Sequence, residues 1–249
     1  IDNILQRHGC FTHVYFPPDG NSTLAVLKKC LASRNQINVI VAGKTLEPRW
    51  LTPELAEKEM ERGLMIWDFA SDSNPDIVLS AAGDYLTKEA LAAIDIVKTE
   101  APKIKTRFVN ILELCEIGIG NKECRADRHD FNDYFTADKP VIVNFHGYPE
   151  TMKQVLFDNA NSIGRFSVHG YIENGSTTTP FDMHVRNNTS RWHLAMEVFQ
   201  KMAERGVIGK DEASNLIAKY RQKLKEHGEF IRKNGVDPEE LENWQWTRS

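Results

Sequence analysis

The sequence predicts an α/β protein with a mostly parallel sheet and helices on both of its faces. Short apolar runs, typical of strands buried on both faces, alternate with longer segments whose apolar residues recur at helical spacing. This alternation is the pattern of parallel sheets, because their crossover connections are usually helices. The chain then closes with two amphipathic helices and no further strand, so we expect these C-terminal helices to be added to the α/β unit.

The first forty-four residues begin the pattern. A strand is expected at Thr12–Phe16, where β-branched and aromatic residues alternate, and a Pro-Pro-Asp-Gly turn ends it. The following helix is expected to have Asn21 or Ser22 as its N-cap. The nearly continuous apolar run Ile37–Ala42 predicts a strand buried on both faces, which stops just before Lys44.

A connector is expected at residues 45–75. Thr52 as N-cap and Pro53 at the first helical position begin a short helix there. Trp50 and Trp67 flank this helix and are expected to pin the connector onto a domain surface. The charged residues of the helix predict that it is mostly solvated: Glu54, Glu57, Lys58, Glu59, Glu61 and Arg62.

The strand and helix rhythm continues in residues 76–249. Four strands are expected in this part, at Ile77–Ala82, Ile104–Asn110, Val141–Phe145 and Phe166–Ile172. Helices are expected between them at Thr87–Glu100 and Pro149–Asp158. The two closing helices are predicted to begin at an N-cap of Ser190 and near Asp211.

Composition excludes several classes of function. Hydrophobic residues make up 41% and charged residues 27%, which is ordinary globular composition, and the formal charge of −4 includes no basic stripe that would suit nucleic acid. No apolar run is long enough to span a bilayer, and no signal-peptide pattern begins at Ile1, so we expect a cytoplasmic protein with no membrane partner. The missing initiator Met fits processing or a fragment of a longer polypeptide. The four cysteines form no Cys-x-x-Cys pair and are expected to be reduced: Cys10, Cys30, Cys115 and Cys124.

Lys44 is the first candidate for a binding residue. Gly43-Lys44-Thr45 looks like the end of a P-loop, but Asn38 stands where that motif needs glycine, and the strand leaves no room for a phosphate-cradling loop. Lys44 still lies just past the carboxyl end of a predicted strand, where open α/β sheets bind ligands. The alternative is an ordinary surface lysine.

Motifs for catalysis and metal binding are lacking. His146, His169 and His184 have no helical ligand spacing, so no metal site is predicted, and His169 in a strand pattern fits a core or interface histidine. No Gly-x-Ser-x-Gly or Gly-x-Gly-x-x-Gly motif occurs. The sequence also lacks a Gly-Asp-Gly followed by paired Asn residues, which would hold a metal and a diphosphate.

The densest polar segment is residues 173–183. After a flexible glycine it offers four hydroxyl groups that could hold an oxyanion or the backbone of a partner. The alternative is a hydrogen-bonded turn made rigid by Pro180. Together with His169, the candidates for an interface or ligand-binding turn are Gly175, Ser176, Thr177, Thr178 and Thr179.

Several strings of this sequence resemble phosphoketolases. His169–Tyr171 and Gly175–Met183, followed by Val185, Asn187 and Arg191, look like the C-terminal signature region of that family. The resemblance extends in the same order over nearly the whole chain and includes Tyr15–Pro18, Asn38–Lys44, Trp67-Asp68 and Phe135–Pro140.

The resemblance implies a fold and an activity. Phosphoketolases are thiamine-diphosphate and divalent-metal enzymes of the transketolase-like group. They cleave xylulose 5-phosphate or fructose 6-phosphate with inorganic phosphate, giving acetyl phosphate, water and an aldose phosphate. Their chains are several times longer than this one. By this resemblance, residues 1–44 are the tail of the preceding pyrimidine-binding domain, 45–75 are a linker, and 76–249 are a domain like the transketolase C-terminal domain.

The resemblance also implies which functions this chain holds. The family lysine that contacts the sugar phosphate corresponds to Lys44, whereas no catalytic or cofactor-binding residue of the family has a counterpart here. Thiamine diphosphate and Mg²⁺ would therefore belong to the full-length enzyme, a homo-oligomer, and this chain alone is expected to be inactive. A free-standing regulatory or metabolite-binding module that uses Gly175–Thr179 is the alternative.

Overall fold

The centre of the molecule is a mostly parallel sheet. The structure is a computed structural model that describes residues 1–5, 11–44, 46–117, 131–157, 163–172, 175 and 177–248. Within these residues, five strands lie in the order β3-β5-β4-β6-β7. Four are mutually parallel and β3 is antiparallel to β5: β3 Leu64–Ile66, β4 Ile77–Ala82, β5 Thr106–Ile111, β6 Val141–Phe145 and β7 Phe166–Gly170. The predicted sheet class is confirmed.

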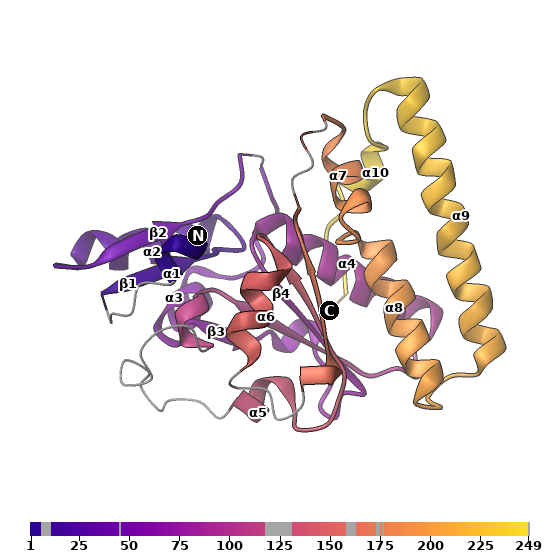
Figure 1. Ribbon diagram of the computed structural model, residues 1–249, viewed down its shortest axis with the longest axis horizontal. Helices are drawn as coiled ribbons and strands as arrows, with labels where there is room; N and C mark the ends of the chain where they lie inside the picture. Colours follow the sequence, from indigo (N-terminus) through magenta and orange to yellow (C-terminus); the bar gives the residue numbers. More distant parts are fainter. Residues whose placement is uncertain are drawn as a thin grey trace.

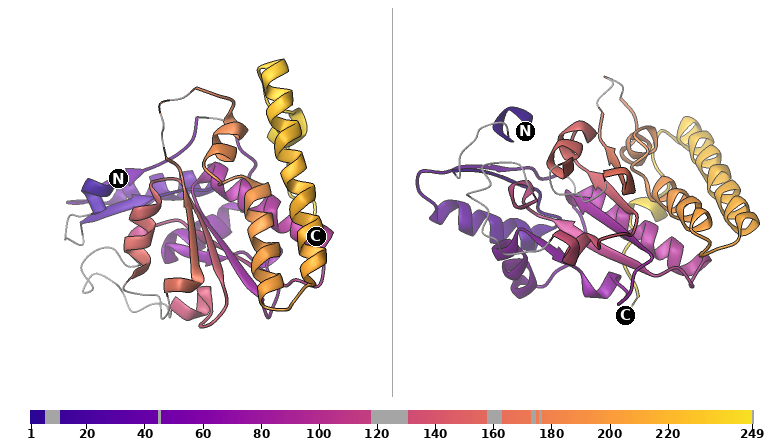
Figure 2. Two further views of the ribbon diagram at one scale, coloured as in Figure 1. Left: turned by 45° about the vertical axis from the view of Figure 1, so that its right-hand side comes forward. Right: turned by 60° about the horizontal axis from the view of Figure 1, so that its bottom comes forward.

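Helices cover both faces of this sheet (Figures 1 and 2). Alternate residues of a strand point to opposite faces, and in β4 Ile77 and Leu79 enter one core while Val78 and Ala82 enter the other. The first core includes side chains of α4 Asp84–Glu100 and α8 Arg191–Glu204. The second includes side chains of α5 Phe131–Phe135 and α6 Pro149–Phe157.

The closing helices form an outer layer. Helix α9, Lys210–Asn234, packs along α8 and stands at the edge of the molecule (Figure 2). Short helices α7, Pro180–Arg186, and α10, Glu239–Glu242, lie before and after this pair, and 3₁₀ turns occur at Asp68–Ala70, Leu114–Glu116 and Ile163–Arg165. No helix in the described part of the chain is long and apolar enough to cross a membrane.

The N-terminal elements form a second, smaller sheet on one side of the molecule (Figure 1). After α1 Asp2–Leu5, strand β1, Thr12–Tyr15, pairs in parallel with β2, Ile37–Ile40, and helix α2, Gly20–Ala32, connects them. Val14 and Phe16 join the second core of the large sheet. The small sheet is therefore separate in its strand pairing but packed on the larger unit.

Two predictions for this part were wrong. Ile37–Ala42 was expected to be buried on both faces, but Ile37 is 48% exposed and β1 is the one strand that pairs with β2 among the described residues. The N-cap of α2 is Asp19, two or three residues earlier than predicted. One carboxylate oxygen of Asp19 accepts from the Ser22 backbone, and the other accepts from the connector at Trp50, so this aspartate fixes two segments.

The connector is anchored more firmly than the sequence indicated. Helix α3, Pro53–Arg62, begins at Thr52 as predicted, and the Thr52 hydroxyl accepts from the Leu55 backbone at 3.3 Å. The prediction of a mostly solvated helix was wrong at Glu59, which is fully buried and accepts hydrogen bonds from Trp67 and Asn110 at 2.8 and 3.1 Å.

The last described residues return to this connector. The Trp244 ring lies 6.1 Å from that of Trp50, and the Trp246 ring lies 5.7 Å from that of Phe69. Arg248 also forms an ion pair with Asp95 on α4. The tail therefore closes over the connector and over α4 together.

Candidate functional site

Three parallel strands end side by side at one edge of the large sheet. β4 is followed by Gly83 and Asp84, β6 by His146 and β7 by Tyr171. The ladder continues past the strand ends, because the His146 backbone donates to Ala82 and the Tyr171 backbone donates to Gly147, both at 2.9 Å. Open α/β sheets bind ligands at this carboxyl edge.

Asp84 and His146 come together because of Gly83. This glycine has a φ of +110°, and a Cβ at its position would lie 2.6 Å from the Cβ of His146. The Asp84 carboxylate accepts from the Tyr85 backbone at 2.7 Å and lies 3.9 Å from His146 Nδ1. Burial lowers the pKa of His146, and the nearby Asp84 charge opposes that shift. His146 is therefore a neutral group at neutral pH.

The segment that carries Lys44 reaches this same edge. The Gly43 backbone N–H donates to Asp84 Oδ2 at 2.5 Å, and the Lys44 side chain is exposed next to this contact. The sequence placed Lys44 at the carboxyl end of its own short strand. The structure also places Gly43, the residue before Lys44, at the carboxyl edge of the large sheet. No local sequence pattern could indicate this position.

A buried ion pair involves the chain just after Lys44 in the sequence. Lys88 Nζ is 2.7 Å from Glu47 Oε2, and the two side chains are 4% and 7% exposed. Lys88 Nζ also lies 4.1 Å from the ring centroid of Tyr85, which stacks on His184. Burial raises the pKa of Tyr85 and lowers the pKa of His184 to about 4, so both rings are neutral at neutral pH.

The predicted threonine turn is largely engaged within the protein. The Thr178 hydroxyl donates to Asp182 at 2.6 Å, and the Thr179 hydroxyl donates to Asp237 at 2.7 Å. Thr177 and Gly175 are exposed, with Gly175 at a φ of +67°, and Ser176 lies outside the described residues. This geometry matches the hydrogen-bonded turn that was the alternative interpretation.

The turn also lines a hollow of its own. Thr177–Thr179 form one wall of a cavity of about 540 Å³, and Arg186 and Arg232 are among its other lining residues. Lys44 and Asp84 do not line this cavity. The threonine turn and Lys44, the two candidates from the sequence, are therefore at separate places in the described structure.

The candidate histidine His169 has a different environment. It lies within β7, and its Nε2 atom is 2.5 Å from Glu197 on α8, which also pairs with Lys201 at 3.4 Å. His169 thus connects an edge strand to the helix that covers it. Across the described parts of the chain, no group of three or more His, Cys, Asp or Glu side chains is placed to hold a metal ion.

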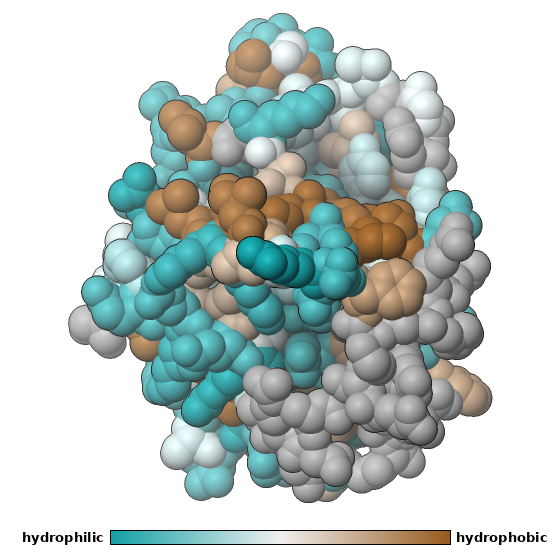
Figure 3. Space-filling model, turned by 90° about the vertical axis from the view of Figure 1, so that its left-hand side faces the viewer, coloured by the Kyte–Doolittle hydropathy of each residue, from teal (hydrophilic) through white to brown (hydrophobic). Residues whose placement is uncertain are grey.

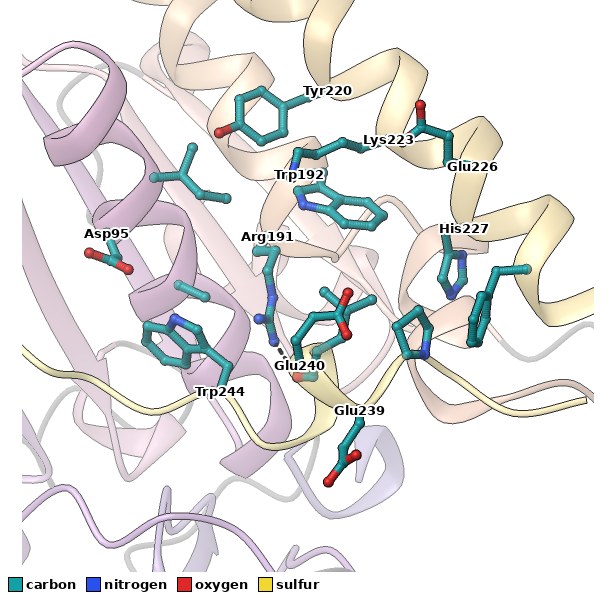
Figure 4. Close-up of a pocket in the computed structure, with 15 residues that line it drawn as sticks. Asp95, Arg191, Trp192, Tyr220, Lys223, Glu226, His227, Glu239, Glu240 and Trp244 are labelled. Atoms are coloured by element: carbon teal, nitrogen blue, oxygen red, sulfur yellow. Dashed lines mark hydrogen bonds between the residues drawn. The ribbon is translucent and has the colours of Figure 1, made fainter. Parts of the chain in front are cut away.

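A larger hollow was not predicted from the sequence. It has a volume of about 750 Å³ and lies between α4, α8, α9 and α10, with Trp192, Trp244 and Arg191 among its lining residues (Figure 4). Arg191 is held by three hydrogen bonds to the buried Glu89. The available signal was the tryptophan content of the last third of the chain, but tryptophans in sequence do not reveal which helices they join.

The comparison with solved structures gives the fold class. A transketolase H261F mutant from Pichia stipitis superposes with a TM-score of 0.59 at 14% identity, covering 78% of this chain and 25% of that one. A split-gene transketolase described as an inactive beta4 tetramer gives 0.55 at 17% identity, covering 78% of this chain and 58% of that one. The molecule is therefore an α/β unit of the transketolase C-terminal type.

The sequence comparison is more specific. The chain belongs to the family described as the XFP C-terminal domain, which matches residues 44–246. A probable phosphoketolase of Brucella abortus (strain 2308) is 39% identical over 99% of this chain, and one of Chlorobaculum tepidum (strain TLS) is 41% identical over the same share. This chain spans 31% of the length of each of those relatives. The resemblance to the C-terminal portion of phosphoketolases is confirmed.

Proposed function

We propose that this chain is the C-terminal part of a phosphoketolase that cleaves xylulose 5-phosphate or fructose 6-phosphate with inorganic phosphate. Residues 1–44 would be the tail of the pyrimidine-binding domain, 45–75 the linker and 76–249 the C-terminal domain. The cytoplasmic full-length enzyme would be a homo-oligomer that binds thiamine diphosphate and Mg²⁺ through its other domains. The family match over residues 44–246 supports this proposal, as does the separate strand pairing of the N-terminal sheet.

The contribution of this chain to the reaction would be a substrate contact. Lys44 would bind the phosphate of the sugar, which carries close to two negative charges and needs fixed cations. The observation that carries this role is the bond from Gly43 to Asp84, because it fixes the backbone beside an exposed lysine at the edge where α/β sheets bind ligands. The reacting carbonyl lies at the other end of the sugar, so the contact would supply remote binding energy.

Replacing Lys44 tests this role in the full-length enzyme. Lys44→Ala is expected to raise KM for xylulose 5-phosphate and to lower kcat/KM by roughly ten- to a hundredfold, the effect of losing one charged hydrogen bond. Steady-state acetyl phosphate formation is the measurement. The matched control is Lys103→Ala, which removes a half-exposed lysine that pairs with Glu212 far from the carboxyl edge. A kcat/KM within about twofold of wild type would make Lys44 an ordinary surface lysine.

A free-standing module that binds a metabolite through Gly175–Thr179 is the second candidate. The hollow beside the threonines and its two arginines favour it. The engagement of Thr178 and Thr179 by neighbouring carboxylates counts against it. The source gene separates the two functions: a phosphoketolase gene encodes a long segment upstream of residue 1, whereas the gene of a free-standing module does not.

A further inference from the structure

The first turn of α4 holds the chain on both sides of Lys44. Asp84 accepts from the Gly43 backbone, and Lys88 pairs with Glu47. Asp84 and Lys88 are four residues apart, so they lie on the same face of the helix, one above the other. We propose that this turn positions Lys44 for its ligand, with Asp84 as the positioning residue. The inference rests on the proposed sugar-phosphate contact of Lys44.

The contact between Asp84 and the backbone at position 43 requires a glycine there. Both carboxylate oxygens are used, since Oδ2 accepts from Gly43 at 2.5 Å and Oδ1 accepts from the Tyr85 backbone at 2.7 Å. A Cβ at position 43 would overlap the carboxylate, so the close approach depends on glycine. Behind the carboxylate stands His146, which fills the space left by Gly83.

The contact at Lys88 fixes the far end of the same span. The Lys88 and Glu47 side chains are nearly inaccessible to solvent, and a buried ion pair keeps its geometry because separating the charges leaves each one desolvated. The ammonium of Lys88 also rests on the face of the Tyr85 ring. Gly43 and Glu47 are therefore tied to one rigid helix, while the Lys44 side chain extends into solvent.

This arrangement has a functional advantage. A lysine on a freely moving connector would lose conformational freedom each time it bound an anion, and that loss weakens binding. Fixing the backbone in advance removes part of the cost. Asp84 itself is an acidic residue that would repel a phosphate, and each of its carboxylate oxygens already accepts from a backbone N–H, so we assign it no direct contact with substrate.

The decisive change is Asp84→Asn, which keeps the size of the side chain but leaves one acceptor oxygen for two backbone donors. In the full-length enzyme, we expect KM for xylulose 5-phosphate to rise about three- to tenfold with kcat within about twofold of wild type. In a Lys44→Ala background the same change should add less than about 1.5-fold, because Asp84 acts through Lys44. The control Asp76→Asn makes the same substitution at a carboxylate that accepts from the Lys105 backbone at the opposite end of β4, and it should leave KM unchanged.

A structural readout on the 249-residue chain separates this inference from the proposed function. Amide hydrogen exchange at Gly43 should become faster in Asp84→Asn and stay unchanged in Asp76→Asn. Unchanged exchange at Gly43 overturns the positioning contact. Faster exchange with fully additive effects of Asp84→Asn and Lys44→Ala on KM overturns its role in positioning Lys44. If Lys44→Ala has no kinetic effect, the proposed role of Lys44 fails and the kinetic part of this inference fails with it.

A second variant covers the case in which Asp84→Asn does not fold. Gly43→Ala disturbs the same bond from the other side, because its methyl group meets the carboxylate. It should reproduce the rise in KM and the loss of additivity with Lys44→Ala. A wild-type KM in Gly43→Ala overturns the proposal.

Discussion

Glu59 shows how one buried residue makes stability depend on pH. Burial raises its pKa from 4.5 to about 8, although hydrogen bonds from Trp67 and Asn110 act in the opposite direction. The folded protein therefore binds a proton more tightly at this site than the unfolded chain does. The stability linked to that proton is fully present below pH 4.5 and is lost as the pH rises through 8.

We predict that Glu59→Gln removes this pH dependence. Glutamine keeps an oxygen to accept from Trp67 and Asn110, and it carries no charge at any pH. Urea unfolding of the wild-type chain at pH 6 and pH 9 should show a loss of about a few kcal/mol at the higher pH, and the variant should lose much less. The control Glu57→Gln removes an exposed carboxylate that pairs with Lys28 and should behave as wild type. If all three proteins lost the same free energy of unfolding between pH 6 and pH 9, Glu59 would not be the source of this pH dependence.

At the level of elements, α2 is the most unusual. Its buried residues are Ser22, Ala25 and Val26, whereas its leucines form an exposed row. Figure 3 shows hydrophobic side chains gathered on this side of the molecule. The exposed apolar residues of this N-terminal part include Phe11, Leu24, Leu27, Leu31 and Ile37. An apolar row of this kind is typical of a surface that is covered by another part of the protein.

We predict that this row makes the isolated chain associate with itself. Replacing Leu24 and Leu31, which are 67% and 84% exposed, by lysine should shift the chain toward monomer with little loss of stability. Sedimentation velocity over a range of concentrations is the measurement. The matched control is Val236→Lys, a 58% exposed apolar residue distant from α2. Identical sedimentation of the double variant and the wild-type chain would show that the row drives no association.

The elements also show what local sequence can predict. Strands β4 and β6 and the Ser190 start of α8 agree with the prediction, because nearly continuous apolar runs encode the strands and a clear apolar stripe encodes the helix. Strand β3 was missed because three residues are too few to show an alternation. Lys44 was located correctly after a strand, but its support by Asp84 and Lys88 was not predictable. That contact joins segments that only the tertiary fold brings together.

At the level of the whole molecule, the proposed function predicts that the isolated chain is inactive. The cofactor and the catalytic groups would lie in domains that this sequence does not include. An assay with xylulose 5-phosphate, inorganic phosphate, thiamine diphosphate and Mg²⁺ should therefore give no acetyl phosphate, and the full-length enzyme should give it under the same conditions. Turnover by the isolated chain at a rate near that of the full-length enzyme would refute the proposal.

The C-terminal tail has a consequence for biosynthesis. A polypeptide leaves the ribosome N-terminus first, so Trp50 and Phe69 emerge long before Trp244 and Trp246, the rings that cover them. During translation the connector can fold onto α4 only without its aromatic cover. Its final closure therefore waits until Trp244 and Trp246 have left the ribosome, and a nascent chain that stalls before Trp244 leaves this surface open to chaperones.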